Sequence, residues 1–378
     1  MRIILIGPLP PPIHGMSKAN EMLISGLSKS HKITKINTNT LNEISKKTSK
    51  TKKLVRSIVQ IVIGTLKIIG TNADVIYITP AQSANSYLKY IPFMWAARVR
   101  KIPYVIHIHG GYFRKMYNST SGWKRRIIDK SLNGLAGAIV LGPSLRYMFE
   151  GLIPNEKIFV CENGVEDEIF ATEEEIKDKI ERWKNDDTIR IVYLSNLMKA
   201  KGILDLLEAV KILKSEGKKV HLDVAGAIEP EIRTEVEKYF SELKDVVTYH
   251  GVVNGQTKKK LLLDNYIFCL PSNHPLGEGQ PISILEAMAN GYAIVTTDHG
   301  GIKDIVSNSY GVFVEKGNSR STAHGIEEVF KSYEDYSYSA WMQAKDRFSH
   351  SSFVRRIEAV FDSVLKIESK MANKCLRN

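Results

Sequence analysis

Two glutamates in residues 266–298, Glu278 and Glu286, are the side chains whose type and spacing point most directly to chemistry. We expect Glu278 in a glycine-rich loop and Glu286 about one turn into the helix that follows. A helix N-terminus offers unpaired N–H donors and a partial positive charge, so it can hold a phosphate. A carboxylate repels phosphate but accepts hydrogen bonds from neutral hydroxyls, such as those of a ribose. The arrangement suits a nucleotide that carries a further group on its diphosphate.

Residues 266–298 are predicted to form a strand, a loop, a helix and a second strand. The run YIFCL is short, apolar and rich in β-forming residues, as expected for a buried strand. Gly277 and Gly279 let the loop turn sharply and bring its N–H groups close to a ligand. Pro281 suits the start of the helix and Gly291 its end. Glutamates at this spacing in an arbitrary unit are more often solvated than functional, so the interpretation depends on the rest of the chain.

Lys201 and Gly202 stand in the first loop of the second half, just before a helix predicted from the apolar periodicity of residues 203–213. A lysine beside a helix N-terminus can clamp a diphosphate. By itself a loop lysine is usually only solvated. Together with residues 266–298, the pattern predicts two helix N-termini and one lysine that converge on one cleft.

His109 and Gly15 occupy comparable places in the first half. His109 ends a predicted strand and precedes two glycines. It could hydrogen-bond a sugar hydroxyl, or stabilise developing positive charge through its neighbouring carbonyl, although a lone histidine here is more often an ordinary loop residue. Gly15 lies where the first strand turns into a helix, at the edge where open α/β sheets bind ligands. Simple turn chemistry explains Gly15 equally well.

Strands alternate with helices along the whole chain, which predicts parallel sheets covered on both faces. The predicted strands of the first half are 2–9, 73–80, 103–111, 137–144 and 157–165. Those of the second half are 188–196, 220–227, 246–253, 266–270, 292–298 and 310–317.

A chain of 378 residues is comfortable for two domains. We expect an N-terminal domain at residues 1–170 and a C-terminal domain at residues 186–350. The acidic helix 172–187 is the expected linker, and a last helix, 351–378, is expected to cross back to the first domain.

The three cysteines, Cys161, Cys269 and Cys375, are far apart and have no metal-ligand spacing, which favours a reducing compartment without disulfides. We expect no signal peptide, because the first apolar run is short and leads into three prolines. No run reaches the roughly 18 apolar residues that a membrane span needs.

Positive charge is concentrated in the first half of the chain. Residues 1–165 contain 24 lysines and arginines and seven acidic residues, whereas the remainder contains 29 basic and 34 acidic residues. This asymmetry favours an anionic partner for the first half. The basic run 46–70 leads into an apolar helix that suits the surface of an anionic membrane, or equally an ordinary helix that covers a sheet. A nucleic-acid partner is not expected, because the aromatic residues are not interleaved with the basic ones.

In order along the chain, GPLPPPIHG, HIHG, ENGVEDEIF, SNLMKAKG, HGVV, CLPS, EGQPISILEAMANG and TTDHGGIKDIV resemble retaining glycosyltransferase family 4. Each motif alone is weakly specific, but the ordered set covers almost the whole chain. The resemblance implies an α/β GT-B fold, with two Rossmann-like doubly wound domains facing across a cleft. It also implies a nucleotide-sugar donor, retention at the anomeric carbon and no metal or other cofactor.

The resemblance assigns roles to individual residues. Glu286 falls on the residue that binds the ribose, and Lys201 falls on the lysine that binds the diphosphate. Glu278 falls on the glutamate near the donor sugar and phosphates, and His109 on the histidine near the transferred sugar. His109, Lys201 and Glu278 are thereby the predicted catalytic residues.

Further donor contacts follow from the same resemblance. Gly279, Gln280, Pro281 and Ile282 fall on the loop whose backbone amides are expected at the sugar or phosphate. The loop of Gly15 is expected at the phosphates, and Val252 at the base. Asn196 stands where the family often has an arginine on the diphosphate. It can donate a hydrogen bond but carries no charge, which weakens the clamp or marks a subgroup with a different one.

The expected function is a hexosyltransferase of surface polysaccharide synthesis that acts on a glycan or lipid-linked acceptor. We expect it in the cytoplasm, peripheral at the inner face of the cell membrane. A nucleotide-sugar epimerase on the same architecture remains an alternative. An inactive donor-binding subunit is another, which the missing arginine favours slightly.

Overall fold

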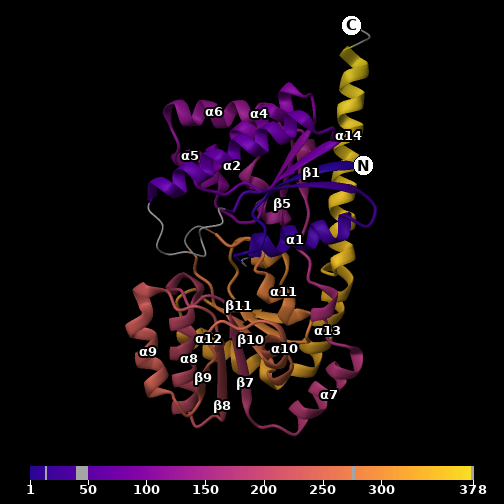
Figure 1. Cartoon of the computed structure of the whole chain (residues 1–378). Coiled ribbons are helices and arrows are strands. Elements are labelled where there is room, and N and C mark those ends of the chain that lie inside the picture. The colour runs from indigo at the N-terminus through magenta and orange to yellow at the C-terminus, as the bar shows by residue number, and fades with distance from the viewer. Residues whose placement is uncertain (13–14, 40–49, 275–276, 376–378) are drawn as a thin grey trace. The chain divides into compact units, whose positions relative to one another are not determined.

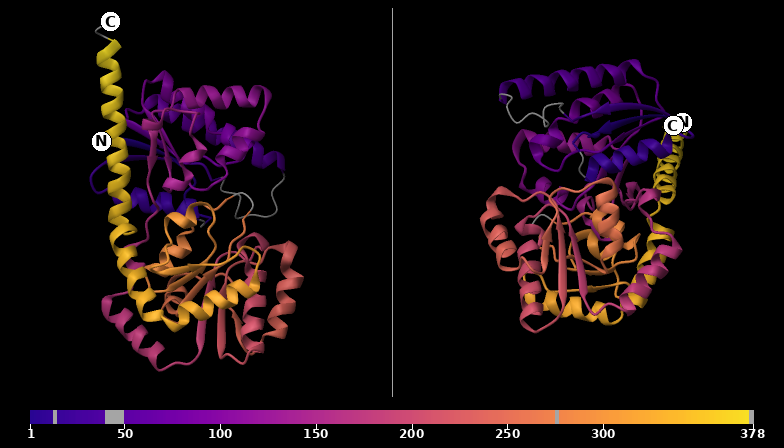
Figure 2. Two further views of the ribbon diagram at one scale, coloured as in Figure 1. Left: turned by 180° about the vertical axis from the view of Figure 1, so that it is seen from behind. Right: turned by 60° about the horizontal axis from the view of Figure 1, so that its bottom comes forward.

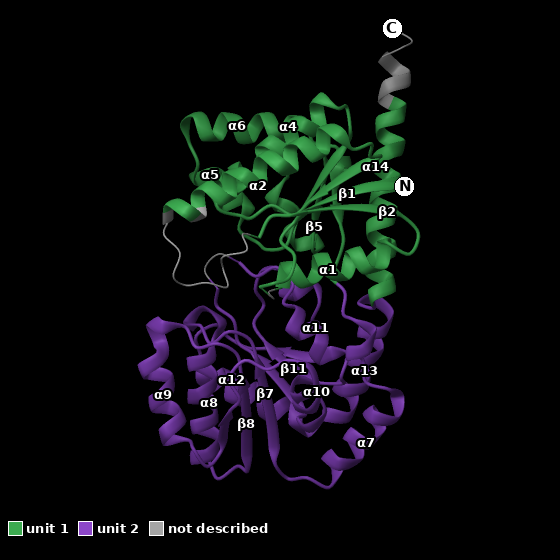
Figure 3. Cartoon of the chain, in the orientation of Figure 1, with its two compact units in different colours: residues 1–163, 350–378 green, residues 164–349 purple. Residues whose placement is uncertain are grey.

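The computed structural model describes residues 1–12, 15–39, 50–274 and 277–375 (Figure 1). They form two compact units. Unit 1 combines Met1–Asn163 with His350–Asn378, and unit 2 is Gly164–Ser349 (Figure 3). The chain therefore enters unit 2 after Asn163, whereas the sequence suggested that the first domain ends at residue 170.

Unit 1 contains a parallel sheet of six strands in the order β2-β1-β3-β4-β5-β6. The strands are β1 Arg2–Gly7, β2 Lys32–Asn37, β3 Val75–Ile78, β4 Tyr104–Ile108, β5 Gly137–Val140 and β6 Ile158–Val160. The predicted alternation of strands and helices is confirmed, but β2 was missed. It is an edge strand with mostly exposed or half-buried residues, KITKIN, so it lacks the apolar run of a central strand.

Helices cover both faces of this sheet. They are α1 Gly15–Leu27, α2 Lys50–Gly70, α3 Ala84–Leu88, α4 Ile91–Val99, α5 Phe113–Ser119, α6 Gly122–Asn133 and α14 His350–Cys375. Side chains alternate across a strand, so Ile4 and Ile6 of β1 join a core with α2 to α6. Ile3 and Leu5 join the opposite core with α1 and α14 (Figure 2). The first four residues of the basic run 46–70 and the last three of the expected helix 351–378 lie outside the described residues.

Unit 2 contains a second parallel six-stranded sheet, in the order β12-β11-β10-β7-β8-β9. Its strands are β7 Ile189–Leu194, β8 Val220–Ala225, β9 Val247–Tyr249, β10 Ile267–Leu270, β11 Ala293–Thr296 and β12 Gly311–Phe313. All six coincide with predicted strands. The strand order reverses between β7 and β10, and ligands of doubly wound sheets bind beyond the carboxyl ends of the strands at such a switch point.

The helices of unit 2 are α7 Glu173–Lys184, α8 Ile203–Ser215, α9 Arg233–Glu242, α10 Gly255–Asp264, α11 Ile282–Met288, α12 Ser319–Lys331 and α13 Tyr333–Arg347. The expected linker 172–187 is instead α7, a packed helix of this unit. Ile176 and Ile180 are buried in its core, and the buried ammonium of Lys179 donates to the carbonyls of Leu262 and Asn290 at 3.2 and 3.0 Å. The acidic residues that had suggested a linker lie on the opposite, exposed or half-buried face.

Candidate functional site

Glu278 and Lys201 meet at the switch point of unit 2. The Lys201 Nζ atom lies 2.7 and 2.8 Å from the two carboxylate oxygens of Glu278. The Ser272 hydroxyl donates to Glu278 Oε1 at 2.6 Å. Only 6% of Glu278 is exposed, whereas Lys201 is half-buried. The structure thus joins two residues that are 77 positions apart and that the sequence assigned to one site.

The Lys201 ammonium controls the charge of Glu278. Burial alone would raise the pKa of this carboxyl group, because desolvation disfavours the charged form. The attraction and hydrogen bonds of Lys201, with the hydrogen bond from Ser272, outweigh burial and lower the pKa below its usual value. Glu278 is therefore a carboxylate at neutral pH, and the pair is a polar centre that forms before any ligand binds.

Gly202 explains how the Lys201 loop reaches the loop after β10. Its φ is +74°, and a Cβ atom there would lie 2.1 Å from the carbonyl oxygen of Pro271. Only glycine allows both this backbone conformation and this approach. The Asn273 amide donates to the Ala200 carbonyl at 3.0 Å and fixes the contact, and the Ser272 hydroxyl oxygen lies 3.2 Å from the same carbonyl oxygen.

A second glycine turn supports the backbone of Glu278. Gly300 has a φ of +57°, and a Cβ atom on it would lie 2.3 Å from the carbonyl oxygen of Glu278. The amide of Gly301 donates to the same oxygen at 3.0 Å. The sequence had placed these glycines in a family motif without a role. The spacing of these glycines in the sequence does not identify Glu278 as their contact, because the glycines and Glu278 lie in separate loops.

Glu286 forms a second ion pair, with a lysine that the sequence analysis missed. It lies on α11, is 3% exposed, and its Oε2 atom is 2.5 Å from Nζ of Lys258 on α10. Lys258 is one of three consecutive lysines, which suggest a solvated helix face. The side-chain amide of Asn290 also donates to the Glu286 carbonyl, at 2.8 Å.

The remaining predicted donor residues follow the strand ends of unit 2. Gly279 and Gln280 are buried, and Pro281 precedes Ile282, the first residue of α11. Asn196 is exposed two residues after β7, where its carbonyl accepts a hydrogen bond from the Tyr193 hydroxyl at 3.0 Å.

Val252 does not lie at a strand end as expected, since β9 stops at Tyr249. Its side chain is 73% exposed on the following loop. The carbonyl of the preceding Gly251 accepts a hydrogen bond from the Gly226 amide at 2.8 Å, which holds this loop beside the end of β8. A contact of Val252 with a base stays a prediction.

His109 belongs to unit 1, directly after β4. Its ring lies 4.2 Å from that of His107, whose Nδ1 atom is 2.7 Å from the Tyr77 hydroxyl. Burial lowers the pKa of His109 from 6.5 to about 4, although a hydrogen bond with Asn163 opposes the shift. Nε2 of His109 is buried without a hydrogen-bond partner among the described residues. His109 is thus a neutral imidazole with an unsatisfied nitrogen, which suits a bond to a hydroxyl group.

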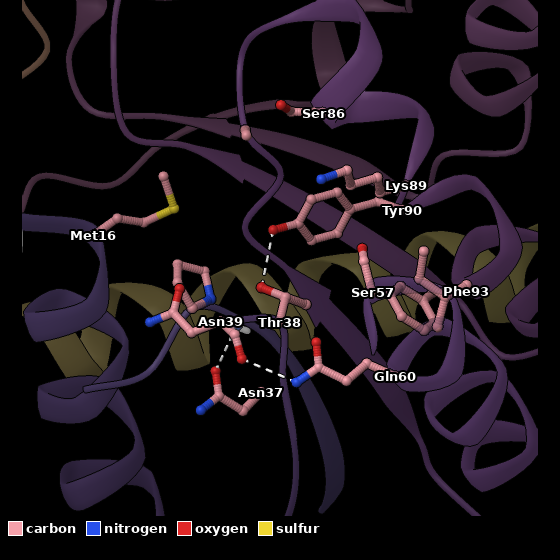
Figure 4. A pocket seen from close by; sticks show the side chains of 13 residues that line it. Met16, Asn37, Thr38, Asn39, Ser57, Gln60, Ser86, Lys89, Tyr90 and Phe93 are labelled. Atoms are coloured by element: carbon pink, nitrogen blue, oxygen red, sulfur yellow. Dashed lines mark hydrogen bonds between the residues drawn. The ribbon is translucent and has the colours of Figure 1, made fainter. Parts of the chain in front are cut away.

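Gly15 is the first residue of α1, also in unit 1. Beside it lies a pocket of about 260 Å³ at the carboxyl ends of β1, β2 and β3 (Figure 4). Its lining combines seven amide or hydroxyl side chains, one cation and five apolar residues: Pro8, Met16, Asn37, Thr38, Asn39, Ser57, Gln60, Ile61, Ala81, Ser86, Lys89, Tyr90 and Phe93. The sequence analysis did not identify this pocket, because its lining comes from the missed strand β2, from α2 and from the segments around α3 and α4.

No group of three or more His, Cys, Asp or Glu side chains is placed to hold a metal ion in the part of the chain that the structure describes. Catalysis without a metal remains a prediction. The structure brings together Lys201 with Glu278, and Glu286 with Lys258. His109 and Gly15 lie in the other unit, so their part in the same reaction is also a prediction.

Residues 173–341 match the family model described as "Glycosyl transferases group 1". This span contains both ion pairs. The amylovoran biosynthesis glycosyltransferase AmsK of Erwinia amylovora is 29% identical over 176 residues, which is 45% of this chain and 41% of that protein. The capsular polysaccharide biosynthesis glycosyltransferase CapM of Staphylococcus aureus is 24% identical over 224 residues, 55% of each chain. The chain spans about half the length of the curated relatives it matches.

The solved structure of HepE from Anabaena in complex with UDP superimposes with a TM-score of 0.74. The two share 15% sequence identity, and the match covers 96% of this chain and all of that one. At this low sequence identity, the structural similarity shows a shared fold. The expected GT-B fold, with two Rossmann-like α/β units, is confirmed.

Proposed function

We propose that this protein is a retaining, metal-independent hexosyltransferase that moves a sugar from a nucleotide-sugar donor to a glycan or lipid-linked acceptor. We assign it to surface polysaccharide synthesis, at the cytoplasmic face of the membrane. The observation that carries the proposal is the Lys201–Glu278 pair at the switch point of a sheet in the span matched by the glycosyltransferase family. The names of AmsK and CapM supply the polysaccharide context, and the UDP complex of HepE supports a nucleotide donor.

Lys201 is suited to the diphosphate because its position is fixed before the donor arrives. An ammonium group has three N–H donors, of which Glu278 accepts two among the described residues. The third remains for a phosphate oxygen. In this proposal Glu278 orients the lysine, and Glu286, oriented by Lys258, accepts hydrogen bonds from the ribose hydroxyls.

The proposed reaction breaks the bond between the anomeric carbon and the diphosphate oxygen. The acceptor hydroxyl oxygen forms the new bond on the same face, and its proton passes to the departing diphosphate. Negative charge develops on that leaving group, so Lys201 and backbone amides near α11 lower the barrier where the charge appears. The neutral imidazole of His109 hydrogen-bonds a hydroxyl of the transferred sugar.

The pocket of unit 1 is our candidate for the acceptor. Seven of its lining side chains carry an amide or hydroxyl group, which suits a polyhydroxylated ligand, and Lys89 adds one positive charge. Thr38 and Tyr90 are already hydrogen-bonded to each other at 3.1 Å, so their hydroxyl groups are oriented before an acceptor binds.

A panel of nucleotide sugars tests the proposal. The true donor should raise the melting temperature, because it binds only the folded protein. With that donor and an acceptor, Lys201→Ala and Glu286→Ala should each lower turnover by about a hundredfold or more, as expected when stabilisation of developing charge is lost. The matched control Lys238→Ala, on an exposed lysine of unit 2, should keep the normal rate. Nuclear magnetic resonance of the product reports whether the anomeric configuration is retained.

Other outcomes identify the alternatives. Normal transfer by both Lys201→Ala and Glu286→Ala would refute the site. A changed donor sugar without transfer identifies an epimerase. Donor binding with neither reaction identifies a donor-binding subunit, which would explain the uncharged Asn196. Thermal unfolding of each variant excludes a folding defect as the cause of lost turnover.

A further inference from the structure

Helix α2 exposes an apolar face that the two ion pairs and the pocket do not explain. Eight large aliphatic side chains on this helix are each 45–61% exposed: Leu54, Val55, Ile58, Val59, Val62, Ile63, Leu66 and Ile69. They are half of the 16 large hydrophobic side chains that are exposed among the described residues. Single exposed hydrophobic residues are common on soluble proteins, but a contiguous set usually marks an interaction surface.

The eight side chains lie on one side of the helix because they recur at spacings of three and four. The opposite side is already packed in unit 1. Ile68 is fully buried, and a Cβ atom on Gly64 would lie 2.8 Å from the Phe93 ring of α4 and 2.9 Å from Ile36 of β2. Helix α2 is therefore apolar on two faces, which explains why its sequence shows no clean division into an apolar and a polar side. Its exposed face takes no part in the packing of the core of unit 1.

The segment that carries this face is strongly basic. Residues 50–101 include nine lysines and arginines and one acidic residue, Asp74, which pairs with Arg2 at 2.7 Å. On α2 itself, Lys52, Arg56 and Lys67 are exposed and no acidic residue is present. Helix α4 packs against α2 and adds exposed Trp95. An apolar strip with cations on the same helix suits the boundary between acyl chains and anionic headgroups.

Two other occupants fit these observations less well. A second copy of the chain related by a two-fold axis would place this surface against itself and oppose its own cations. The segment 40–49 has two large aliphatic residues, Leu41 and Ile44, too few to cover eight. In the described part of the chain no helix is long and apolar enough to cross a bilayer, so the contact expected of α2 is interfacial.

We propose that the exposed face of α2 is a docking surface for an anionic lipid bilayer, on which the helix lies parallel to the membrane plane. Ser57 and Gln60 of the same helix line the pocket of unit 1 (Figure 4). Docking therefore holds that pocket near the lipid headgroups, where a lipid-linked acceptor would present its polar end. This last consequence rests on the proposed function, whereas docking itself requires no transfer reaction.

The test measures binding of the full chain to vesicles by sedimentation. Vesicles of phosphatidylcholine with about one-third phosphatidylglycerol should bind the protein at least about tenfold more tightly than phosphatidylcholine alone, and high salt should weaken binding. The variant Val59→Glu/Ile63→Glu places two charges on the apolar face and should lose at least about tenfold in affinity. Met342→Glu, on a similarly exposed residue of α13, adds charge elsewhere and should bind like the unchanged protein.

A second measurement identifies the surface in contact. An environment-sensitive dye is attached to Val62→Cys or, as a control, to Met342→Cys, in a chain where Cys375 is serine; Cys161 and Cys269 are buried. Anionic vesicles should shift the emission of the Val62 label to the blue and leave the control unchanged. Equal vesicle binding by the double glutamate variant, or an unshifted Val62 label, would overturn the proposal. So would a dimer in light scattering that the double variant dissociates. Failed transfer with intact docking would count against the proposed function alone.

Discussion

At the scale of residues, the candidate site consists of charges that are paired before any ligand binds. Glu278 and Glu286 are almost fully buried, and each has a lysine partner of its own. A buried carboxylate without a partner would be costly, and removing one member of such a pair commonly costs about 3–5 kcal/mol. The ion pairs therefore hold these carboxylate and ammonium groups in fixed orientations before a ligand binds.

His109 provides a test through the pH dependence of stability. Its pKa is about 4 in the folded protein, against 6.5 for an unperturbed histidine, so between these values the unfolded chain takes up the proton more readily. The contribution to stability is complete above 6.5 and declines as the pH falls toward 4. Between about pH 7 and pH 5 this one group should remove about 2 kcal/mol from the free energy of unfolding.

Urea denaturation at both pH values measures this effect. The variant His109→Gln should lose about 2 kcal/mol less than the unchanged protein over the same interval. Burial and the neighbouring His109 both lower the pKa of His107, so the difference between the two proteins also includes the effect of His109 on His107. Equal losses in the two proteins would mean that His109 titrates normally and is not shielded from water.

At the scale of elements, glycines determine how closely two loops of unit 2 approach. Gly202 and Gly217 have nearly the same positive φ, +74° and +77°. A Cβ atom on Gly202 would collide with the carbonyl of Pro271, whereas one on Gly217 would meet nothing within 4 Å. The two positions thus separate the cost of the backbone conformation from the cost of the contact.

Gly217→Ala should destabilise the protein by about 1–2 kcal/mol, the strain of a left-handed alanine. Gly202→Ala should cost at least about 2 kcal/mol more, because a main-chain atom must move. It should also weaken donor binding at temperatures where the variant is folded, since Lys201 is the neighbouring residue. Chemical denaturation and titration with the donor measure the two effects. Equal destabilisation by both substitutions would contradict the close contact at Pro271.

The sequence was sufficient for elements with a strong local pattern. The predicted strands 2–9 and 188–196 each contain a continuous apolar stretch, residues 3–6 and 191–194, so these central strands were predicted within a few residues. The edge strand β2 was missed because it packs only one residue, Ile36, fully into the core. Lys258 was missed because its partner, Glu286, lies on another helix. The close approach of Gly300 to the Glu278 backbone is likewise a contact between separate loops. Local periodicity carries no information about such partners.

At the scale of the molecule, α14 completes a unit from which it is separated in sequence by the whole of unit 2. Phe353 and Phe361 of this helix are fully buried in the core beneath β1 and β3. The ring of Phe361 lies 6.1 Å from that of Tyr77, whose hydroxyl contacts His107. The surroundings of His109 therefore depend on a helix that begins about 240 residues later in the chain.

Phe361→Ala should destabilise unit 1 by about 3–5 kcal/mol, as large cavities in a core do. Hydrogen exchange followed by mass spectrometry should show faster exchange in β1, β3 and β4 and unchanged exchange in β7 to β12. Phe330→Ala, a partly buried core residue of unit 2, is the reciprocal control and should accelerate exchange there. Equal acceleration in both sheets after either substitution would mean that the units unfold as one.

The position of α14 also has a consequence for biosynthesis. A ribosome delivers every strand of the first sheet, and then all of unit 2, before it delivers the helix that closes the first core. Until then Leu5, Tyr77 and Val105 lack the aromatic side chains that shield them in the finished protein. A nascent chain stalled before His350 should consequently recruit chaperones to its N-terminal portion, while residues 164–349 mature on their own.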